Sequence, residues 1–281
     1  MKKKINRSKG GTIAIFLLLG IMAVFMFLPF IYAIMQSLKP MEEIYAFPPK
    51  FFVKNPTGES YRLLATLTDS VWVPFSRYLA NTVFVTVVST LVHLLFASMA
   101  AFVLAKYEFP GSKLLSRVVE SSLLFAGPVT ALPQYIIMNM LGFVDTFWAV
   151  ILPAICAPIG LFLMKNFIGQ ISNAMLEAAK IDGAGYFRIY RTIVLPIVKP
   201  ALLTLVLFGF RDVWSNVPTT TIFTERLKTL PMVTTQIVAG GTARSGNAAA
   251  ITVIMMIPPI LVYLISQSNV IETMTSAGIK E

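Results

Sequence analysis

Long apolar runs, free or nearly free of charged side chains, alternate along this chain with shorter polar segments. A helix needs about 20 mostly apolar residues to cross a bilayer, and lipid offers no partners to unpaired backbone groups. We therefore predict an all-α membrane protein in which each run is a transmembrane helix. Six spans are expected, at about residues 12–38, 79–105, 118–144, 146–168, 200–218 and 247–269.

The ends of the chain are polar, with a basic segment at residues 1–11 and a short tail at 272–281 flanking a six-span domain at 12–271. The first apolar run is too long for the core of a secretory signal and lacks a small-x-small cleavage site, so we interpret it as an uncleaved span. Six spans place both termini on one side. Lys and Arg are more frequent in the segments on that side, which predicts a multi-pass protein of the plasma or inner membrane with both termini cytoplasmic.

The composition agrees with a membrane protein, because 56% of the residues are hydrophobic and only 13% are charged, against about 25% charged in soluble domains. The net charge of +10 fits basic loops beside anionic lipid, and no basic face carries the interleaved aromatics that would indicate nucleic acid binding. One Cys and one His exclude a disulfide framework and a His-based metal cluster. We expect no nucleic acid partner, no cofactor and no metal.

The loop between the fourth and fifth expected spans, residues 170–199, predicts two short helices separated by a turn. Ser172 or Asn173 can cap the first helix, which strong helix formers continue. Small side chains let another protein approach the backbone closely, and aromatic side chains can enter a groove of a partner. The alternative is an ordinary interfacial helix bound to lipid headgroups. The residues expected to contact a partner are Glu177, Ala178, Ala179, Asp182, Gly183, Tyr186, Phe187 and Arg188.

The same loop carries a family motif, in which Glu177-Ala178-Ala179, Gly183, Ile193 and Leu195-Pro196 follow the spacing E-A-A-x3-G-x9-I-x-L-P. This pattern resembles the EAA motif of permease subunits of ATP-binding-cassette importers. Residues 106–111 and 141–146 resemble carbohydrate-type permeases, and residues 274–280 resemble the tail of the smaller six-span subunit of maltose-type transporters. The resemblance implies the type I importer permease fold, with the loop at 170–199 coupling to an ATPase.

The resemblance also implies a set of partners: a second permease subunit, two ATPase subunits and an extracytoplasmic solute-binding protein that delivers a sugar or oligosaccharide. The chain has no G-x-x-x-x-G-K-[ST] phosphate loop, so we expect a non-catalytic subunit with ATP hydrolysis in a separate partner. By its position, the last outer loop is expected to reach into the binding protein through Gly240, Gly241, Thr242, Ala243 and Arg244.

Charged residues inside a span are costly and usually functional, and the fifth expected span contains Arg211 and Asp212. Either they line the substrate pathway or they join neighbouring helices. Adjacent side chains on a helix point about 100° apart, so we do not expect this pair to satisfy only each other. We expect His93, in the second span, to form a helix–helix hydrogen bond rather than a proton relay. The candidate pathway residues are Arg211, Asp212, Trp214, Asn216, Asn139 and Gln134.

Two other functions remain open from the sequence. The same architecture could import a non-sugar solute, such as glycerol phosphate, an amino acid or a peptide. An ion-coupled secondary transporter would need acidic residues deep in several spans, and here only Glu120 and Asp212 come near such positions.

Overall fold

The computed structural model describes residues 9–69, 73–125, 127–241 and 244–278. The chain divides into two compact units, one formed by Met1–Thr68 with Thr234–Ile254 and the other by Asp69–Val233 with Met255–Glu281. The longer helices are α1 (Lys9–Ser37), α3 (Glu59–Asp69), α4 (Phe75–Lys106), α5 (Ser112–Ser122), α6 (Gly127–Met140), α7 (Trp148–Ile155), α8 (Pro158–Gly169), α9 (Asn173–Ile181), α12 (Lys199–Trp214), α13 (Leu230–Ala239) and α14 (Ser245–Gly278).

The expected all-α membrane fold is confirmed. Among the described residues, four helical segments are long and apolar enough to cross a membrane: residues 10–37, 75–106, 148–169 and 245–267. A bent pair, Tyr186–Ile197 and α12, makes a fifth if it is counted as one span. The number six stays a prediction.

The region of the expected third span, 118–144, holds two helices, α5 and α6, neither of which reaches 18 residues. The second begins at Gly127-Pro128. Proline has no backbone N–H and is tolerated in the first turn of a helix but disrupts a helix interior, so a new helix starts at this position.

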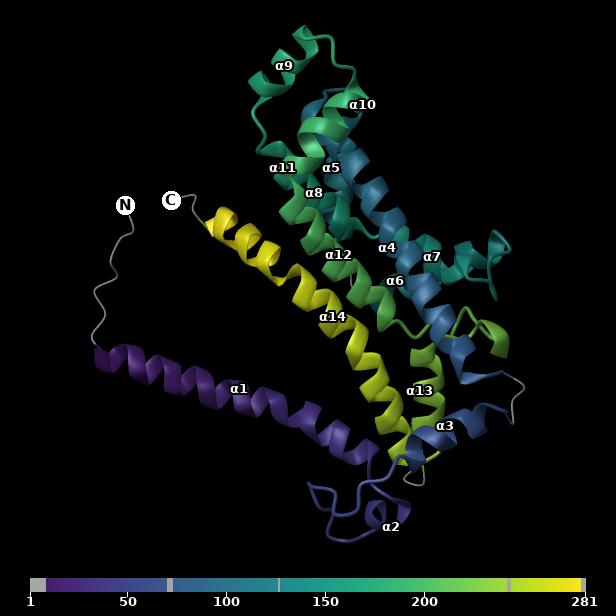
Figure 1. Cartoon of the computed structure of the whole chain (residues 1–281). Helices are drawn as coiled ribbons and strands as arrows, with labels where there is room; N and C mark the ends of the chain where they lie inside the picture. The colour runs from purple at the N-terminus through teal and green to yellow at the C-terminus, as the bar shows by residue number, and fades with distance from the viewer. Residues whose placement is uncertain (1–8, 70–72, 126, 242–243, 279–281) are drawn as a thin grey trace. The chain divides into compact units, whose positions relative to one another are not determined.

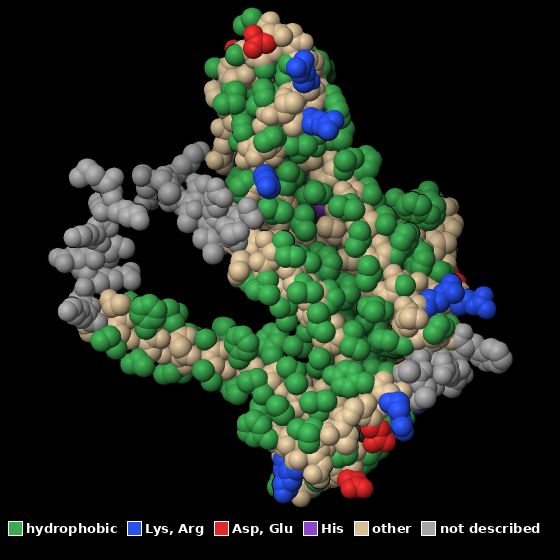
Figure 2. All heavy atoms as spheres, in the orientation of Figure 1, with side chains coloured by type: hydrophobic (Ala, Val, Ile, Leu, Met, Phe, Trp, Pro, Cys, Tyr) green, Lys and Arg blue, Asp and Glu red, His purple; other side chains and the backbone are tan. Residues whose placement is uncertain are grey.

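Helix α4 is the central element of the second unit, where it packs against α7, α8 and α12 (Figure 1). Its small residues Ala97 and Ala101 are buried and let neighbouring helices approach closely. Figure 2 shows that hydrophobic side chains cover most of the visible surface over α4 and α12, whereas charged side chains appear at the end that carries α9. This distribution suits a helix bundle whose sides face lipid.

A sharp bend joins the helical segment Tyr186–Ile197 to α12, and their axes differ by 79°. The segment runs through α10 (Tyr186–Ile189), a π-helical turn (Tyr190–Val194) and α11 (Leu195–Ile197). Pro200 lies in the first turn of α12, and it lacks the backbone N–H that a continuous helix would bond to the carbonyl of Pro196. The chain turns at Val198, which has a φ of −91° and a ψ of 10°.

The first unit contains α1, a short helix α2 (Met41–Ile44), and α3, with turns between them. The buried ammonium group of Lys39 donates to the carbonyl of Lys50 and to Gln36 Oε1, the latter at 2.9 Å. The carboxylate of Glu43 accepts the amides of Lys54 and Asn55 at 3.0 and 2.9 Å. These bonds order the turns between α1 and α3.

Asp145 connects two turns of the second unit. Its Oδ1 accepts the amides of Phe223 and Thr224 at 2.9 and 2.8 Å, and its own amide donates to the carbonyl of Thr221 at 2.7 Å. The hydroxyl and amide of Thr224, followed by the amide of Phe223, hold the pKa of Asp145 below its ordinary value.

We expect Asp145→Asn to loosen this connection by about 1–2 kcal/mol, because charge-assisted hydrogen bonds are stronger than neutral ones. Asn also tolerates the positive φ of 59° at this position, so the backbone is preserved. A carboxylate with a lowered folded-state pKa contributes stability above its unfolded pKa of about 3.9 and loses it as pH falls through the folded value. The protection factors of the Phe223 and Thr224 amides against hydrogen exchange should therefore fall in the variant at pH 7, and in the wild type only below about pH 4. Equal protection of both proteins at pH 7 would contradict this role.

Candidate functional site

We call residues 172–197 the EAA elbow, because two helical segments here meet at a turn. Helix α9 ends with the amide of Ala184 donating to the carbonyl of Ala179 at 2.9 Å and the amide of Gly183 donating to the carbonyl of Lys180 at 3.0 Å. This pair of bonds is the Schellman C-cap, which needs a left-handed residue just after the helix. Gly183 supplies it, with φ of 79°.

The EAA elbow has a buried side and an exposed side. Leu176, Ile189 and Val194 are buried against α4, α8 and α12 in a core that includes Met164 and Ile168. On the exposed side an apolar patch remains, and it lies beside the exposed carboxylate of Glu177 and guanidinium of Arg188. An exposed patch rimmed by polar groups marks an interaction surface. Its members are Met175, Ile181, Tyr186 and Phe187.

Polar contacts fix the elbow to the end of α4. The ammonium group of Lys106 donates to the carbonyls of Gly169 and Ile171 and to Asn173 Oδ1, so it joins the end of α8 to the start of α9. Deeper in the bundle, the hydroxyls of Ser98 and Tyr190 lie 2.7 Å apart.

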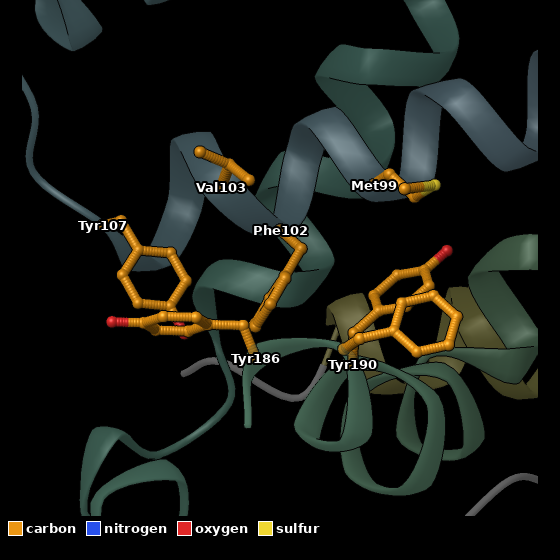
Figure 3. A pocket seen from close by; sticks show the side chains of 7 residues that line it. Met99, Phe102, Val103, Tyr107, Tyr186 and Tyr190 are labelled. Atoms are coloured by element: carbon orange, nitrogen blue, oxygen red, sulfur yellow. The ribbon is translucent and has the colours of Figure 1, made fainter. Parts of the chain in front are cut away.

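Aromatic rings fix the same junction (Figure 3). The Tyr107 ring meets the rings of Phe102 and Tyr186 edge-on at centroid distances of 5.3 and 5.2 Å, an arrangement that aromatic pairs favour. The Lys180 ammonium lies 5.0 Å from the centre of the Tyr107 ring. Burial, then the neighbouring Tyr186, raises the pKa of Tyr107, which therefore stays neutral. These rings and Met99 border an apolar cavity of about 420 Å³.

A larger and more polar cavity, of about 900 Å³, lies among α4, α6, α7, α8 and α12 of the second unit. Four of the six predicted pathway residues line it together: Gln134, Arg211, Asp212 and Asn216. In the described part of the chain, neither Arg211 nor Asp212 forms an ion pair, and both are exposed. Among the described residues, Arg211 and Asp212 therefore line the cavity without an ion pair that joins neighbouring helices, and their place in a pathway stays a prediction.

The other two predicted pathway residues lie elsewhere. Asn139 does not line the polar cavity. The Trp214 indole is buried, stacks on Phe210 with ring centroids 5.4 Å apart, and donates from Nε1 to the carbonyl of Met255 at 3.0 Å. Trp214 thus anchors α12 to α14.

Two aromatic residues that the sequence analysis did not single out, Tyr135 and Phe208, also line the polar cavity. Helical spacing could have found Phe208, because residues three and four positions apart share a face and Phe208 precedes Arg211 and Asp212 by these intervals. His93 lines the cavity too, and its Nδ1 lies 2.8 Å from the carbonyl of Ile155. This contact is the helix–helix hydrogen bond expected of it.

The predicted binding-protein loop is described in part, since Thr242 and Ala243 lie outside the described residues. Gly241 has a φ of 80° and its carbonyl accepts the amide of Arg244 at 3.1 Å. A side chain at Gly240 would have its Cβ 2.6 Å from Cδ of Arg244. The glycines therefore permit a tight turn.

Transmembrane helices, a polar cavity among them and an exposed apolar patch on the EAA elbow are the features of a membrane transport subunit. Residues 63–276 match the family described as binding-protein-dependent transport system inner membrane component, and the chain belongs to this family. It is a multi-pass inner-membrane permease, the non-catalytic subunit of an ATP-binding-cassette importer that works with ATPase and binding-protein partners. The resemblance carried by the EAA motif is confirmed.

Relatives cover most of the chain. Protein LplC of Bacillus subtilis (strain 168) is 34% identical over 200 residues, which are 71% of this chain and 65% of LplC, just under two thirds of its length. The polygalacturonan/rhamnogalacturonan transport system permease protein YtcP of the same strain is 30% identical over 262 residues, 86% of this chain and 88% of YtcP. A crystal structure of a bacterial ABC transporter involved in the import of the acidic polysaccharide alginate contains a chain with the same fold. The two chains superpose with a TM-score of 0.79 and are 24% identical in sequence. The match covers 93% of the present chain and 98% of the transporter chain.

We expect Gly183→Ala to weaken the elbow by about 1–2 kcal/mol, because a residue with a Cβ pays this cost in left-handed backbone. No atom lies within 4 Å of the new Cβ, so the effect is purely conformational. Gly185→Ala is the matched control, since Gly185 has an ordinary φ of −70° and equally open space. Hydrogen exchange at Ala184 should quicken in the first variant and stay unchanged in the second. The same exchange rate in both variants would refute the role of Gly183.

Proposed function

We propose that this chain pairs with a second permease subunit and moves a sugar or oligosaccharide into the cytoplasm, with both termini on the cytoplasmic side. The observation that carries the proposal is the polar cavity among membrane helices. Its amide and charged side chains suit the hydroxyl groups of a sugar, and Tyr135 and Phe208 offer faces on which a sugar ring can rest.

The charged side chains of the cavity indicate which class of sugar it would bind. Arg211 has no acidic partner among the described residues, so its guanidinium is free to bind a carboxylate of an acidic sugar. The relative YtcP is named for transport of polygalacturonan and rhamnogalacturonan, which supports a uronate-containing oligosaccharide here. The sugar's hydroxyl groups would donate hydrogen bonds to Asp212, and they would exchange hydrogen bonds with the amides of Gln134 and Asn216.

The EAA elbow is proposed as the site where one of two ATPase subunits docks. Tyr186 and Phe187, each 66% exposed, would enter a groove of the ATPase, and Glu177 would meet a basic side chain at its edge. Asp182 and Gly183 would shape the turn, and the small side chain of the exposed Ala178 would let the partner approach α9 closely. Ala179, also predicted to contact the partner, is half-buried and packs against the core of the second unit. The turn at Gly240–Arg244 is proposed to contact the solute-binding protein.

Arg211→Gln tests the pathway. We expect uptake of uronate oligosaccharides to fall by about tenfold or more, because a hydrogen bond to a charged group is worth about 1.5–3 kcal/mol, while uptake of neutral oligosaccharides changes less. The measurement is uptake of labelled oligosaccharides into vesicles that hold the complete transporter. Arg117→Gln, the same change at an exposed arginine outside the cavity, is the control. Equal uptake by both variants for every cargo would remove Arg211 from the pathway.

Glu177→Lys tests the coupling site. We expect the variant to fold and insert normally, because Glu177 is exposed, yet to lose transport and co-purify poorly with the ATPase subunits. Glu108→Lys makes the same charge reversal at an exposed residue of the neighbouring loop and should leave both measurements unchanged. Normal transport by Glu177→Lys would show that this carboxylate does not couple the two subunits.

A further inference from the structure

One wall of the polar cavity is built on a broken helix. Helix α7 ends at Ile155 and α8 starts at Pro158, and between them Ala157 has a ψ of 122°. This extended backbone is what a following proline favours. Residues on both sides of the break line the cavity, among them Pro153, Ala154 and Ala157.

A helix break leaves carbonyl groups without their usual partners, and the interior of a membrane offers no water to replace them. At this break His93 of α4, only 4% exposed, places Nδ1 2.8 Å from the carbonyl of Ile155. A carbonyl only accepts, so Nδ1 carries the hydrogen and donates it. His93 thereby replaces the amide that a continuous helix would have supplied.

Gly160 makes room for the imidazole, and Gly209 borders it on the other side. A side chain at Gly160 of α8 would place its Cβ 2.1 Å from His93 Nε2 and 2.7 Å from Cε1. On α12, a Cβ at Gly209 would lie 3.9 Å from His93 Cδ2, in ordinary contact. The ring is therefore held closely between α8 and α12 while it bonds the end of α7.

Other polar side chains on this face of α4 do not make such a connection. The hydroxyl groups of Thr86, Ser89 and Thr90 are buried and have no hydrogen-bond partner in the described part of the chain. Among these four described side chains, only His93 adds a hydrogen bond to the packing of α4 against the α7–α8 break.

We propose that His93 is a positioning residue for transport: its Nδ1 holds the α7–α8 break, and with it one wall of the polar cavity, against α4. It does not need to touch cargo. The consequence for transport rests on the proposed function of the cavity, whereas the positioning itself can be measured without any cargo.

The first test uses a reporter in the cavity wall, Ala157→Cys combined with Cys156→Ser, which removes the only native cysteine. The measured quantity is the rate at which N-ethylmaleimide modifies Cys-substituted chains in membranes that hold the complete transporter. His93→Asn keeps an N–H at the place of Nδ1, whereas His93→Gln moves the same amide one methylene further. We expect the modification rate of the His93→Asn chain to stay within about twofold of the rate of the reporter chain that keeps His93. The rate of the His93→Gln chain should change by about tenfold, which is the effect of one lost hydrogen bond.

The second test uses Gly160. Gly160→Ala should change the rate as His93→Gln does, because its methyl group displaces the imidazole. The double variant Gly160→Ala, His93→Asn should recover the modification rate of the reporter chain, since Asn has no atom at the place of Nε2. Such non-additivity is the sign of direct coupling between two residues. It also guards against a variant that merely misfolds.

The proposal is overturned if Asn and Gln at position 93 give the same rate, or if Gly160→Ala leaves the rate unchanged. Uptake measured in parallel separates the two claims. The predicted pattern of rates together with reduced uptake in His93→Gln supports both claims. The pattern with normal uptake upholds the positioning role and counts against the cavity as the pathway.

Discussion

A backbone amide or carbonyl without a partner costs several kcal/mol in hydrocarbon, and the second unit of this protein depends on how its helix breaks meet that constraint. At the α7–α8 break, His93 supplies the missing donor to Ile155. At the bend before α12, the amide of Val198 donates to the carbonyl of Val194 and the carbonyl of Val198 accepts the amide of Leu202, both at 3.0 Å. The chain turns by 79° there and keeps its hydrogen bonds on either side.

The α7–α8 break also borders the polar cavity. A straight, fully apolar helix in place of α7 and α8 would need no polar neighbour on α4 and would leave little reason for a polar cavity beside it. At the break, α4 places His93 among buried hydroxyl groups, and these residues line the same cavity as Arg211 and Asn216. Irregular backbone at membrane depth is tolerated where it is buried in protein or lines a cavity, and here it lines one.

Much of the fold could be predicted from the sequence, because length and apolar composition alone define a spanning helix, as in α1 and α4. The EAA elbow was also predictable, since its glycine and its helix formers act locally. The polar cavity was harder, because its members come from five helices and only three-dimensional packing brings them together. Trp214 illustrates the difficulty: an aromatic residue beside a polar pair suits a sugar site, yet its indole bonds a carbonyl of α14.

One piece of chain connects the two proposed sites. The segment Tyr186–Ile197 carries the exposed rings of the elbow, and α12, which follows it directly, carries Arg211 and Asp212 into the cavity. The far end of α12 is held to α14 by Trp214, so a force on the elbow would turn α12 about a fixed end rather than shift it whole. An ATPase can drive such a movement only if it binds the elbow with different free energy in the two states. The stiffness of α12 then decides how much of that difference reaches the cavity, and the hydrogen bonds of Val198 keep the elbow and α12 joined at the bend.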